Sequence, residues 1–205
     1  MQTINLIKKQ LSIRQVGIIG QDQMNHAAVI LPLIEVNGKL SILFEVRSFH
    51  LRSQPGDICF PGGKIDEQDS TPKDAAIREF IEELQIETND FQLLTGLDIL
   101  VTPFKGIIYP YVAELTCDFN DIKANLLEVD HLFTVPLEHF INHPPEEHPM
   151  HFIIEPESIE RYEQIRQKRH TIHQYFYHYE DYTIWGLTAR ILNHFINLLL
   201  NYKIL

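Results

Sequence analysis

The sequence predicts a mixed α/β sandwich, in which helices pack against a sheet that contains hairpin-linked strands. Two observations predict this fold class. Runs rich in β-branched residues are interleaved along the chain with segments of helical periodicity, and Asn37-Gly38 joins two of those runs as a two-residue turn. Asn-Gly between apolar runs is typical of a β-hairpin, because both residues tolerate the positive φ angles that the turn needs.

The elements follow from these patterns in chain order. Each expected strand is an apolar or alternating run, and each expected helix shows hydrophobic residues at helical spacing. We expect strands at residues 26–36, 39–47, 91–102, 106–115, 131–137, 150–156 and 170–179. We expect helices at residues 3–15, 72–84, 136–142 and from Trp185 or Gly186 to about Asn201. The Pro-rich segment 143–149, which holds Glu146, Glu147 and His148, is expected to be an exposed loop.

Charge and composition exclude several classes of partner. The 205 residues carry a formal net charge of -11, which argues against general binding of nucleic acid or membranes. No apolar run reaches the roughly 18 residues that a membrane span needs, and the first residues lack the apolar stretch of a signal peptide. Cys59 and Cys117 are too few for a disulfide framework. We therefore expect one cytoplasmic domain that binds a small molecule and neither nucleic acid nor membrane, and we leave a homodimer open.

The segment 72–84 combines an apolar stripe with a cluster of glutamates. Pro72 suits the first helical turn, with Ser70 or Thr71 as the cap. Four apolar residues at helical spacing form one stripe: Ile77, Phe80, Ile81 and Leu84. Three glutamates at i, i+3 and i+4 form a separate acidic patch: Glu79, Glu82 and Glu83. Arg78 lies four residues before Glu82 and can pair with it.

The position of this patch favours a metal site over an ordinary solvated face. The patch follows a Pro-Gly-Gly turn at residues 61–63, whose backbone can approach a ligand closely. Hard cations such as Mg²⁺ prefer carboxylate and carbonyl oxygens, and the two segments offer both. A cation bound there would hold a diphosphate with water in reach.

These residues resemble the sequence box of the Nudix hydrolases, G-x5-E-x7-R-E-U-x-E-E-x-G-U, where U is bulky and apolar. Gly63 takes the first glycine, Asp69 stands where the first Glu is expected, and residues 78–86 take the rest. The resemblance implies a Nudix-type α/β/α sandwich with a mixed β-sheet and a loop–helix–loop catalytic motif. It implies a single Nudix hydrolase domain over residues 1–205, with the box at about 63–86.

Three departures from the box are visible. Asp69 replaces Glu, eight residues instead of seven separate it from Arg78, and Gln85 replaces the last glycine. The first two shorten a carboxylate and lengthen the loop, which puts a metal role for Asp69 in doubt. Gln85 must end the helix without glycine's easy left-handed conformation.

A second motif narrows the substrate that the resemblance implies. The segment 43–63, "LFEVRSFHLRSQPGDICFPGG", is similar to the extension upstream of the box in coenzyme A diphosphatases, L-L-x-x-R-S-x3-R-x3-G-x-V-x-F-P-G-G. Residues 133–137 and 184–192 are similar to later blocks of that subgroup. Arg47 and Arg52 make sense in an acidic protein that binds a polyanion, because the fork of arginine suits phosphates. Pairing of either arginine with surface acids is the simpler alternative.

The resemblance implies metal-dependent cleavage of the diphosphate of coenzyme A or its thioesters, with Mg²⁺ or Mn²⁺ as cofactor. Glu79 and Glu83 are then the expected metal ligands, with Glu82 a third or bridging ligand. A glutamate of the box, or Glu128 further along the chain, accepts the proton of the attacking water, and Arg78 orients the acidic face. The expected substrate-binding residues are Arg47, Ser48, Arg52, Gly62 and Gly63, one guanidinium reaching the 3′-phosphate.

Two alternatives stay open. The same chemistry on ADP-ribose or a dinucleotide would need no site for a 3′-phosphate. A non-catalytic nucleotide sensor with this fold would have no need of three glutamates. The histidines at 170, 173 and 178 do not make a convincing metal site, because alternation on a strand turns His173 away from the other two. Trp185 is expected to anchor the core or an interface rather than to stack on a base.

Overall fold

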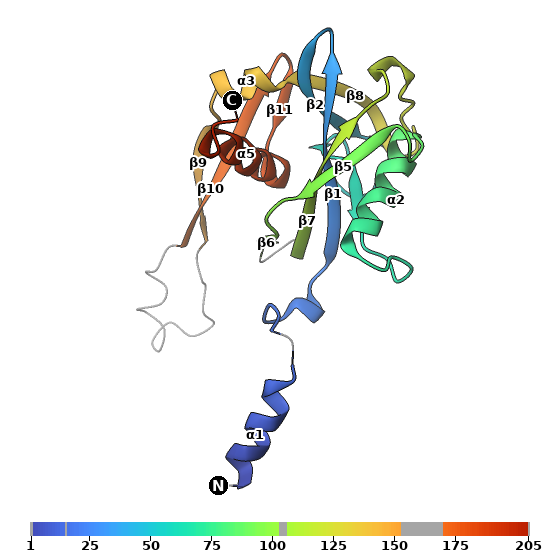
Figure 1. Ribbon diagram of the computed structural model, residues 1–205. Coiled ribbons are helices and arrows are strands. Elements are labelled where there is room, and N and C mark those ends of the chain that lie inside the picture. The colour runs from blue at the N-terminus through green and yellow to red at the C-terminus, as the bar shows by residue number, and fades with distance from the viewer. Residues whose placement is uncertain (1, 15, 103–105, 153–169, 205) are drawn as a thin grey trace.

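A mixed sheet of eight strands forms the centre of the structure (Figure 1). The structure is a computed structural model that describes residues 2–14, 16–102, 106–152 and 170–204. The main path of the sheet runs β3 (Ile58–Cys59), β2 (Lys39–Arg47), β1 (His26–Val36), β7 (Gly106–Leu115) and β5 (Phe91–Gly96). Three further strands pair with β1, β7 and β2, respectively: β4 (Gly62–Lys64), β6 (Leu100–Thr102) and β8 (Val129–Pro136). The pair β1–β7 is parallel and the others are antiparallel, so the sheet is mixed, as predicted.

Alternating side chains on β1 and β2 build a core on each face of this sheet. Ile30 and Leu43 pack with Phe80 of helix α2 (Pro72–Leu84) on one face. Leu31 and Phe44, one position further along each strand, pack on the opposite face with helices α3 (Leu137–Asn142) and α5 (Gly186–Asn201). Helices therefore cover both faces, which confirms the predicted α/β/α sandwich.

Helix α2 has the bounds that the sequence predicted, and its two ends explain why. Thr71 is the N-cap and its hydroxyl accepts a 3.2 Å hydrogen bond from the backbone N–H of Asp74. At the other end Gln85 takes the left-handed conformation, with φ 49°, in the place where the family box has glycine. One expectation is wrong: Glu83 is buried with the apolar face while Glu82 is exposed, so the three glutamates do not form one separate acidic patch.

A second, three-stranded sheet in the order β11-β10-β9 packs beside α5 (Figure 1). Its strands are β9 (Glu146–Phe152), β10 (His170–Tyr179) and β11 (Tyr182–Ile184). Strand β9 begins inside the segment expected to be a loop, so that expectation is wrong for residues 146–149. Pro149 fits there because β9 is an edge strand, where a missing N–H breaks no ladder on the outer side. The expected strand at 150–156 is described only as far as residue 152.

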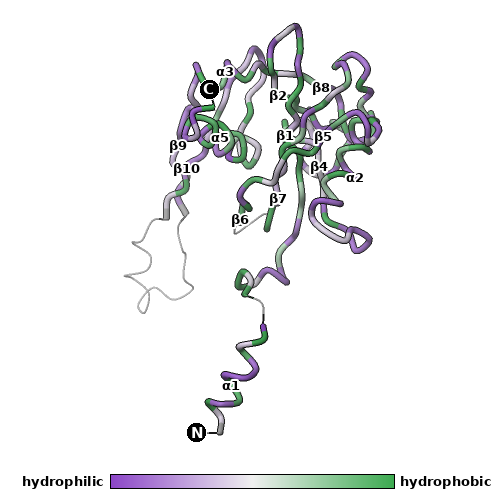
Figure 2. Tube along the Cα trace, viewed as in Figure 1, coloured by the Kyte–Doolittle hydropathy of each residue, from purple (hydrophilic) through white to green (hydrophobic). Residues whose placement is uncertain are grey.

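The remaining differences from the expected elements are small. The expected strand at 91–102 is divided into β5 and β6, and β3, β4 and β11 are additional short strands. Two short 3₁₀ helices occur at Gln21–Gln23 and Phe119–Asp121. Helix α1 (Gln2–Ser12) stands away from the sheets, and hydrophobic residues alternate with hydrophilic ones along it (Figure 2). Within the described ranges, no helix is long and apolar enough to cross a membrane.

Candidate active site

Helix α2 directs two of its glutamates at the Pro-Gly-Gly turn. Glu83 is only 3% exposed, and its Oε2 accepts a 2.7 Å hydrogen bond from the backbone N–H of Gly62. Glu79, one turn earlier, lies against Gly63 with its side chain 17% exposed. The two carboxylates therefore face the turn rather than bulk solvent.

The two glycines of the turn permit two close approaches, Gly62 to strand β1 and Gly63 to the carboxylate of Glu79. Gly62 has φ 149°, and a Cβ there would collide with the backbone carbonyl of Ala28 on the neighbouring strand. A Cβ on Gly63 would collide with the carboxylate of Glu79. Only a residue without a side chain permits this approach of a helix to a turn.

A third glutamate comes from the turn that leads into β8. The backbone N–H of Asn125 donates to the carbonyl of Glu83 at 2.8 Å, which fixes this turn to the end of α2. The backbone N–H of Ser48 donates to the carbonyl of Glu128 at 2.8 Å, which fixes the same turn to the end of β2. These two anchors bring Glu128 next to the helix although it is 45 residues away from Glu83 in sequence.

Glu79, Glu83 and Glu128 each offer an oxygen within 4.8 Å of the others. In the part of the chain that the structure describes, this is the one group of His, Cys, Asp and Glu side chains so arranged. The structure does not bring Glu82 into this group. Its side chain is 56% exposed and its carboxylate lies 3.3 Å from the guanidinium of Arg78, so a ligand role for Glu82 stays a prediction.

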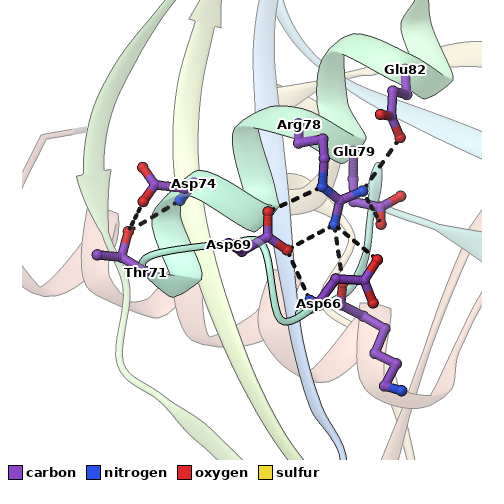
Figure 3. A network of polar contacts seen from close by, with 8 residues as sticks. Asp66, Asp69, Thr71, Asp74, Arg78, Glu79 and Glu82 are labelled. Carbon is purple, nitrogen blue, oxygen red and sulfur yellow. Dashed lines mark hydrogen bonds and ion pairs between the residues drawn. The ribbon is translucent and has the colours of Figure 1, made fainter.

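Arg78 is the centre of an ion-pair network that includes Glu79 (Figure 3). It binds Asp69 with two hydrogen bonds of 3.1 and 2.9 Å, and it also contacts Glu79 at 2.8 Å and the carbonyl of Lys64 at 3.3 Å. The hydrogen bonds from Arg78 hold the pKa of Asp69 below its ordinary value. Asp69 therefore holds the arginine, which in turn orients Glu79, and it stands outside the carboxylate group.

The carboxylates of the site disfavour one another's ionised forms. Burial, followed by repulsion from Glu45, raises the pKa of Glu83 above its ordinary value, and burial also raises the pKa of Glu79. The hydrogen bond from Gly62 to Glu83 and those from Arg78 to Glu79 act in the opposite direction. A cation between the oxygens would remove this repulsion.

Glu45 is a component of the site that the sequence analysis missed. It is fully buried on β2, on the same face as Leu43, and its Oε1 accepts a 3.0 Å hydrogen bond from the thiol of Cys59. Its Oε2 is buried without a hydrogen-bond partner among the described residues. Burial raises the pKa of Glu45, and the charges of Glu128 and Glu79 add to the effect. An acid inside the otherwise apolar strand "LSILFEVR" is the signal that could have found it.

The donor set fits a hard divalent cation. Three carboxylate oxygens converge within 4.8 Å, two of them from groups whose pKa is raised by burial and by neighbouring carboxylates. Mg²⁺ and Mn²⁺ both accept such oxygen donors together with water and phosphate oxygens. Glu79, Glu83 and Glu128 are the residues that would hold the ion.

The other expected substrate residues lie around this centre. Arg47 ends β2, and its Nε is buried without a hydrogen-bond partner among the described residues. Ser48 is 3% exposed and serves as an anchor for the Glu128 turn. Arg52 is exposed in the loop that follows. Neither arginine forms an ion pair with an acid in the described ranges, so the simpler alternative of surface pairing finds no support there.

His173 and His178 lie on β10, outside the carboxylate group, whereas Trp185 immediately precedes α5. His173 pairs with Glu147, whereas His178 lies 3.8 Å from Glu146, in agreement with their expected opposite directions. The side chain of His170 lies outside the described part. Trp185 is 48% exposed, so it is not a core anchor.

The fold and the converging carboxylates define a Nudix hydrolase. The family model described as the NUDIX domain matches residues 24–182, and the chain belongs to this family. It is thus an enzyme of a class that hydrolyses pyrophosphate bonds, and enzymes of this class generally need divalent metal ions.

Two relatives indicate to which subgroup of the family the chain is similar. The chain is 30% identical to the mouse peroxisomal coenzyme A diphosphatase NUDT7 over 173 residues, 82% of this chain and 67% of the relative. It is 34% identical to the Caenorhabditis elegans peroxisomal coenzyme A diphosphatase ndx-8 over 137 residues, 66% and 58% of the two chains. These similarities support membership of the coenzyme A diphosphatase subgroup.

A bacterial relative and a solved structure extend the comparison. The uncharacterized Nudix hydrolase NudL of Photorhabdus laumondii is 33% identical over 179 residues, 84% of this chain and 83% of the relative. The crystal structure of a MutT/nudix family protein from Enterococcus faecalis superposes with a TM-score of 0.53 at 11% identity, covering 97% of this chain and 69% of that one. The latter likeness supports the fold alone.

Proposed function

We propose that this enzyme hydrolyses the diphosphate bond of coenzyme A or its thioesters. The products are 4′-phosphopantetheine, or its acyl form, and adenosine 3′,5′-bisphosphate. The observation that carries the hydrolytic part is the convergence of Glu79, Glu83 and Glu128 beside Gly62 and Gly63. The choice of substrate is supported by the upstream motif at 43–63 and by the similarity to two proteins named as coenzyme A diphosphatases.

The residues of the site have separate tasks in this proposal. Glu79, Glu83 and Glu128 would hold a divalent cation, Mg²⁺ or Mn²⁺, which would supply neutralisation of the diphosphate charge and a lower pKa for a bound water. The Pro-Gly-Gly turn keeps α2 close to the substrate, since Gly62 holds Glu83 by its N–H. Arg78 holds Glu79 in position through the charge-assisted contact at 2.8 Å.

One of the glutamates accepts the proton of the attacking water. The oxygen of this water forms a bond to one phosphorus, and the bridging oxygen leaves with the other phosphate. Glu128 is the better candidate, because Glu83 already accepts a hydrogen bond from Gly62 and Glu79 accepts one from Arg78. A base close to the reacting water contributes about 10²–10⁴-fold to the rate.

The 3′-phosphate separates coenzyme A from the alternative substrates. ADP-ribose and dinucleotides lack this group, so an enzyme specific for them needs no positively charged side chain to bind a 3′-phosphate. Arg52 is exposed in the loop 48–57, which begins at Ser48 beside the Glu128 turn, and in this proposal it binds the 3′-phosphate. The non-catalytic sensor is the weaker alternative, because the acids that hold the metal are assembled.

A substrate panel tests the proposal. The pure protein is incubated with coenzyme A, ADP-ribose and a dinucleoside polyphosphate, with Mg²⁺ or Mn²⁺, and kcat/KM is measured for each. We expect the highest kcat/KM on coenzyme A or one of its thioesters. A higher kcat/KM on ADP-ribose or the dinucleotide would assign the enzyme to the alternative.

The remaining expectations from the sequence stand as proposals. They are a single Nudix domain over residues 1–205, a small-molecule substrate without nucleic-acid or membrane partners, and a cytoplasmic location. Cell fractionation tests the location directly, and recovery of the protein in the peroxisomal fraction would contradict a cytoplasmic location.

A further inference from the structure

A mostly apolar cavity of about 250 Å³ lies between the first turns of α5 and the sheet. Branched aliphatic side chains from β1, β3, β7 and α5 form much of its wall: Val29, Ile58, Ile108, Leu187 and Ile191. The hydroxyl of Thr188 donates to the carbonyl of Ile58 at 3.0 Å, which ties the helix to the strand at the cavity wall. The aliphatic part of the cavity wall therefore belongs to packed helix and strands.

This cavity adjoins the carboxylate group. Gly62 lines it, and the N–H of the same residue binds Glu83. Arg47 also lines it and brings a guanidinium whose Nε is buried without a hydrogen-bond partner in the described part of the chain. If the diphosphate of a substrate is held at the carboxylates, one of the two groups that it joins lies at the cavity. Arg47 is then available to the phosphate that carries this group.

Trp185 forms the outer wall. It is the single tryptophan of the sequence, is 48% exposed and lines the cavity. Its ring stacks on Phe176 of β10, with ring centroids 6.4 Å apart and planes inclined by 6°. The indole is thus held in place while one side stays accessible.

We propose that this cavity binds the pantetheine arm of the coenzyme and that Trp185 and Leu187 determine the preference for that arm. The inference rests on the proposed function. Branched aliphatic walls suit a flexible chain that carries geminal methyl groups. The carboxylate of Asp57, which also lines the cavity, accepts a 3.0 Å hydrogen bond from Gln54 and has further capacity for an amide N–H of the arm.

The other arm of the coenzyme fits this cavity poorly. Adenosine 3′,5′-bisphosphate carries a 3′-phosphate, which Asp57 would repel and the aliphatic walls would desolvate. The nucleotide arm is therefore assigned outside this cavity, where the exposed Arg52 is available to its 3′-phosphate.

Trp185 supplies a direct measurement, because its fluorescence comes from the cavity alone. The full chain is titrated with 4′-phosphopantetheine and, separately, with adenosine 3′,5′-bisphosphate. We expect a saturable change in tryptophan emission with 4′-phosphopantetheine and none with the nucleotide. A change with the nucleotide alone, equal changes with both, or no change with either would overturn the assignment.

A matched pair of variants on α5 identifies the place of binding. Leu187→Phe narrows the cavity, whereas Leu200→Phe makes the same substitution at an exposed position near the end of the helix. We expect Leu187→Phe to weaken binding of 4′-phosphopantetheine at least about tenfold, as for other small changes of pocket size, and Leu200→Phe to leave it unchanged. Equal affinities for the two variants would contradict the proposal.

The titration requires no turnover, so it is separate from the proposed function. If the enzyme binds 4′-phosphopantetheine at Trp185 but does not cleave coenzyme A, the proposed function fails and the cavity assignment stands. If it cleaves coenzyme A but Trp185 does not respond, the cavity assignment fails alone.

Discussion

The backbone N–H of Gly62 donates a 2.7 Å hydrogen bond to Oε2 of Glu83 and thereby fixes α2 against the Pro-Gly-Gly turn. This contact joins two residues that are 21 positions apart in sequence. It buries one carboxylate at the Pro-Gly-Gly turn, and the preceding turn of the helix brings Glu79 to the same place. Glu128 then completes the group from a separate turn.

The first prediction concerns Glu83 and Glu82, which are adjacent in sequence, the first buried and the second exposed. Glu83→Gln is expected to lower turnover at least about 100-fold, the scale of a lost catalytic group. Glu82→Gln is expected to cost clearly less, because Glu82 is exposed and bound to Arg78. Steady-state kinetics at saturating metal compares the two. A larger loss for Glu82→Gln would mean that the carboxylate group is wrongly assigned.

The second prediction concerns Gly63 and its missing side chain. Gly63→Ala puts a Cβ into the carboxylate of Glu79, so we expect turnover to fall at least about tenfold through a displaced ligand. Gly96→Ala is the matched control, since its Cβ meets only Tyr111 at an ordinary 3.5 Å. Thermal unfolding is recorded for both, to separate displacement from misfolding. Full activity of a folded Gly63→Ala protein would contradict the close approach.

The third prediction concerns stability and pH without metal. Burial is the main cause that raises the pKa of Glu45 from 4.5 to about 7 and the pKa of Glu83 from 4.5 to about 9. Each group binds its proton more tightly in the folded chain than in the unfolded chain. Their contribution to stability is therefore complete below pH 4.5 and is lost as pH rises through the folded-state values. For Glu45 the loss is at most on the order of 3 kcal/mol.

Chelator-treated protein is expected to show a free energy of unfolding that decreases from pH 4.5 upward. Glu45→Gln should make this decrease shallower between pH 4.5 and 7, whereas Glu67→Gln, at an exposed position, should not. Added Mg²⁺ should reduce the decrease in the wild type, because the cation stabilises the ionised carboxylates. Denaturant unfolding at several pH values gives the comparison, and identical slopes for Glu45→Gln and wild type would refute the assignment.

The fourth prediction concerns the two arginines. Wild type is expected to prefer coenzyme A over 3′-dephospho-coenzyme A in kcat/KM, by the roughly ten- to hundredfold that a charge-assisted pair contributes. Arg52→Ala should largely erase this preference, since only the full coenzyme has the group to lose. Arg47→Ala should lower kcat/KM on both substrates alike, because Arg47 lines the cavity beside the diphosphate. Equal losses on the two substrates with Arg52→Ala would rule out a 3′-phosphate contact there.

Local signals made α2 predictable to the residue. A capping threonine and a proline in the first turn are read within a short window, and the structure has both. Of the expected apolar stripe, Phe80 and Leu84 are buried, whereas Ile77 and Ile81 are only partly buried. Strand β9 escaped prediction because its proline indicates a loop unless the strand is known to be at an edge. That knowledge depends on partners far away in the chain.

Helical spacing alone could not sort the three glutamates. At about 100° per residue, Glu79 and Glu83 differ by about 40° around the axis, whereas Glu82 and Glu83 differ by about 100°. Which of these directions meets the Pro-Gly-Gly turn depends on how α2 packs on the sheet. Glu45 could not be placed for a similar reason, since its neighbours Glu128 and Glu79 reach it only through the tertiary fold.

The most direct test of the account is to identify the products of coenzyme A by mass spectrometry. Wild type, Glu83→Gln and wild type with excess chelator are incubated with coenzyme A, with Mg²⁺ in the first two reactions. The account predicts equal amounts of 4′-phosphopantetheine and adenosine 3′,5′-bisphosphate from wild type, and almost none from the other two. Intact coenzyme A after incubation with wild type, or undiminished cleavage by Glu83→Gln or in chelator, would contradict it.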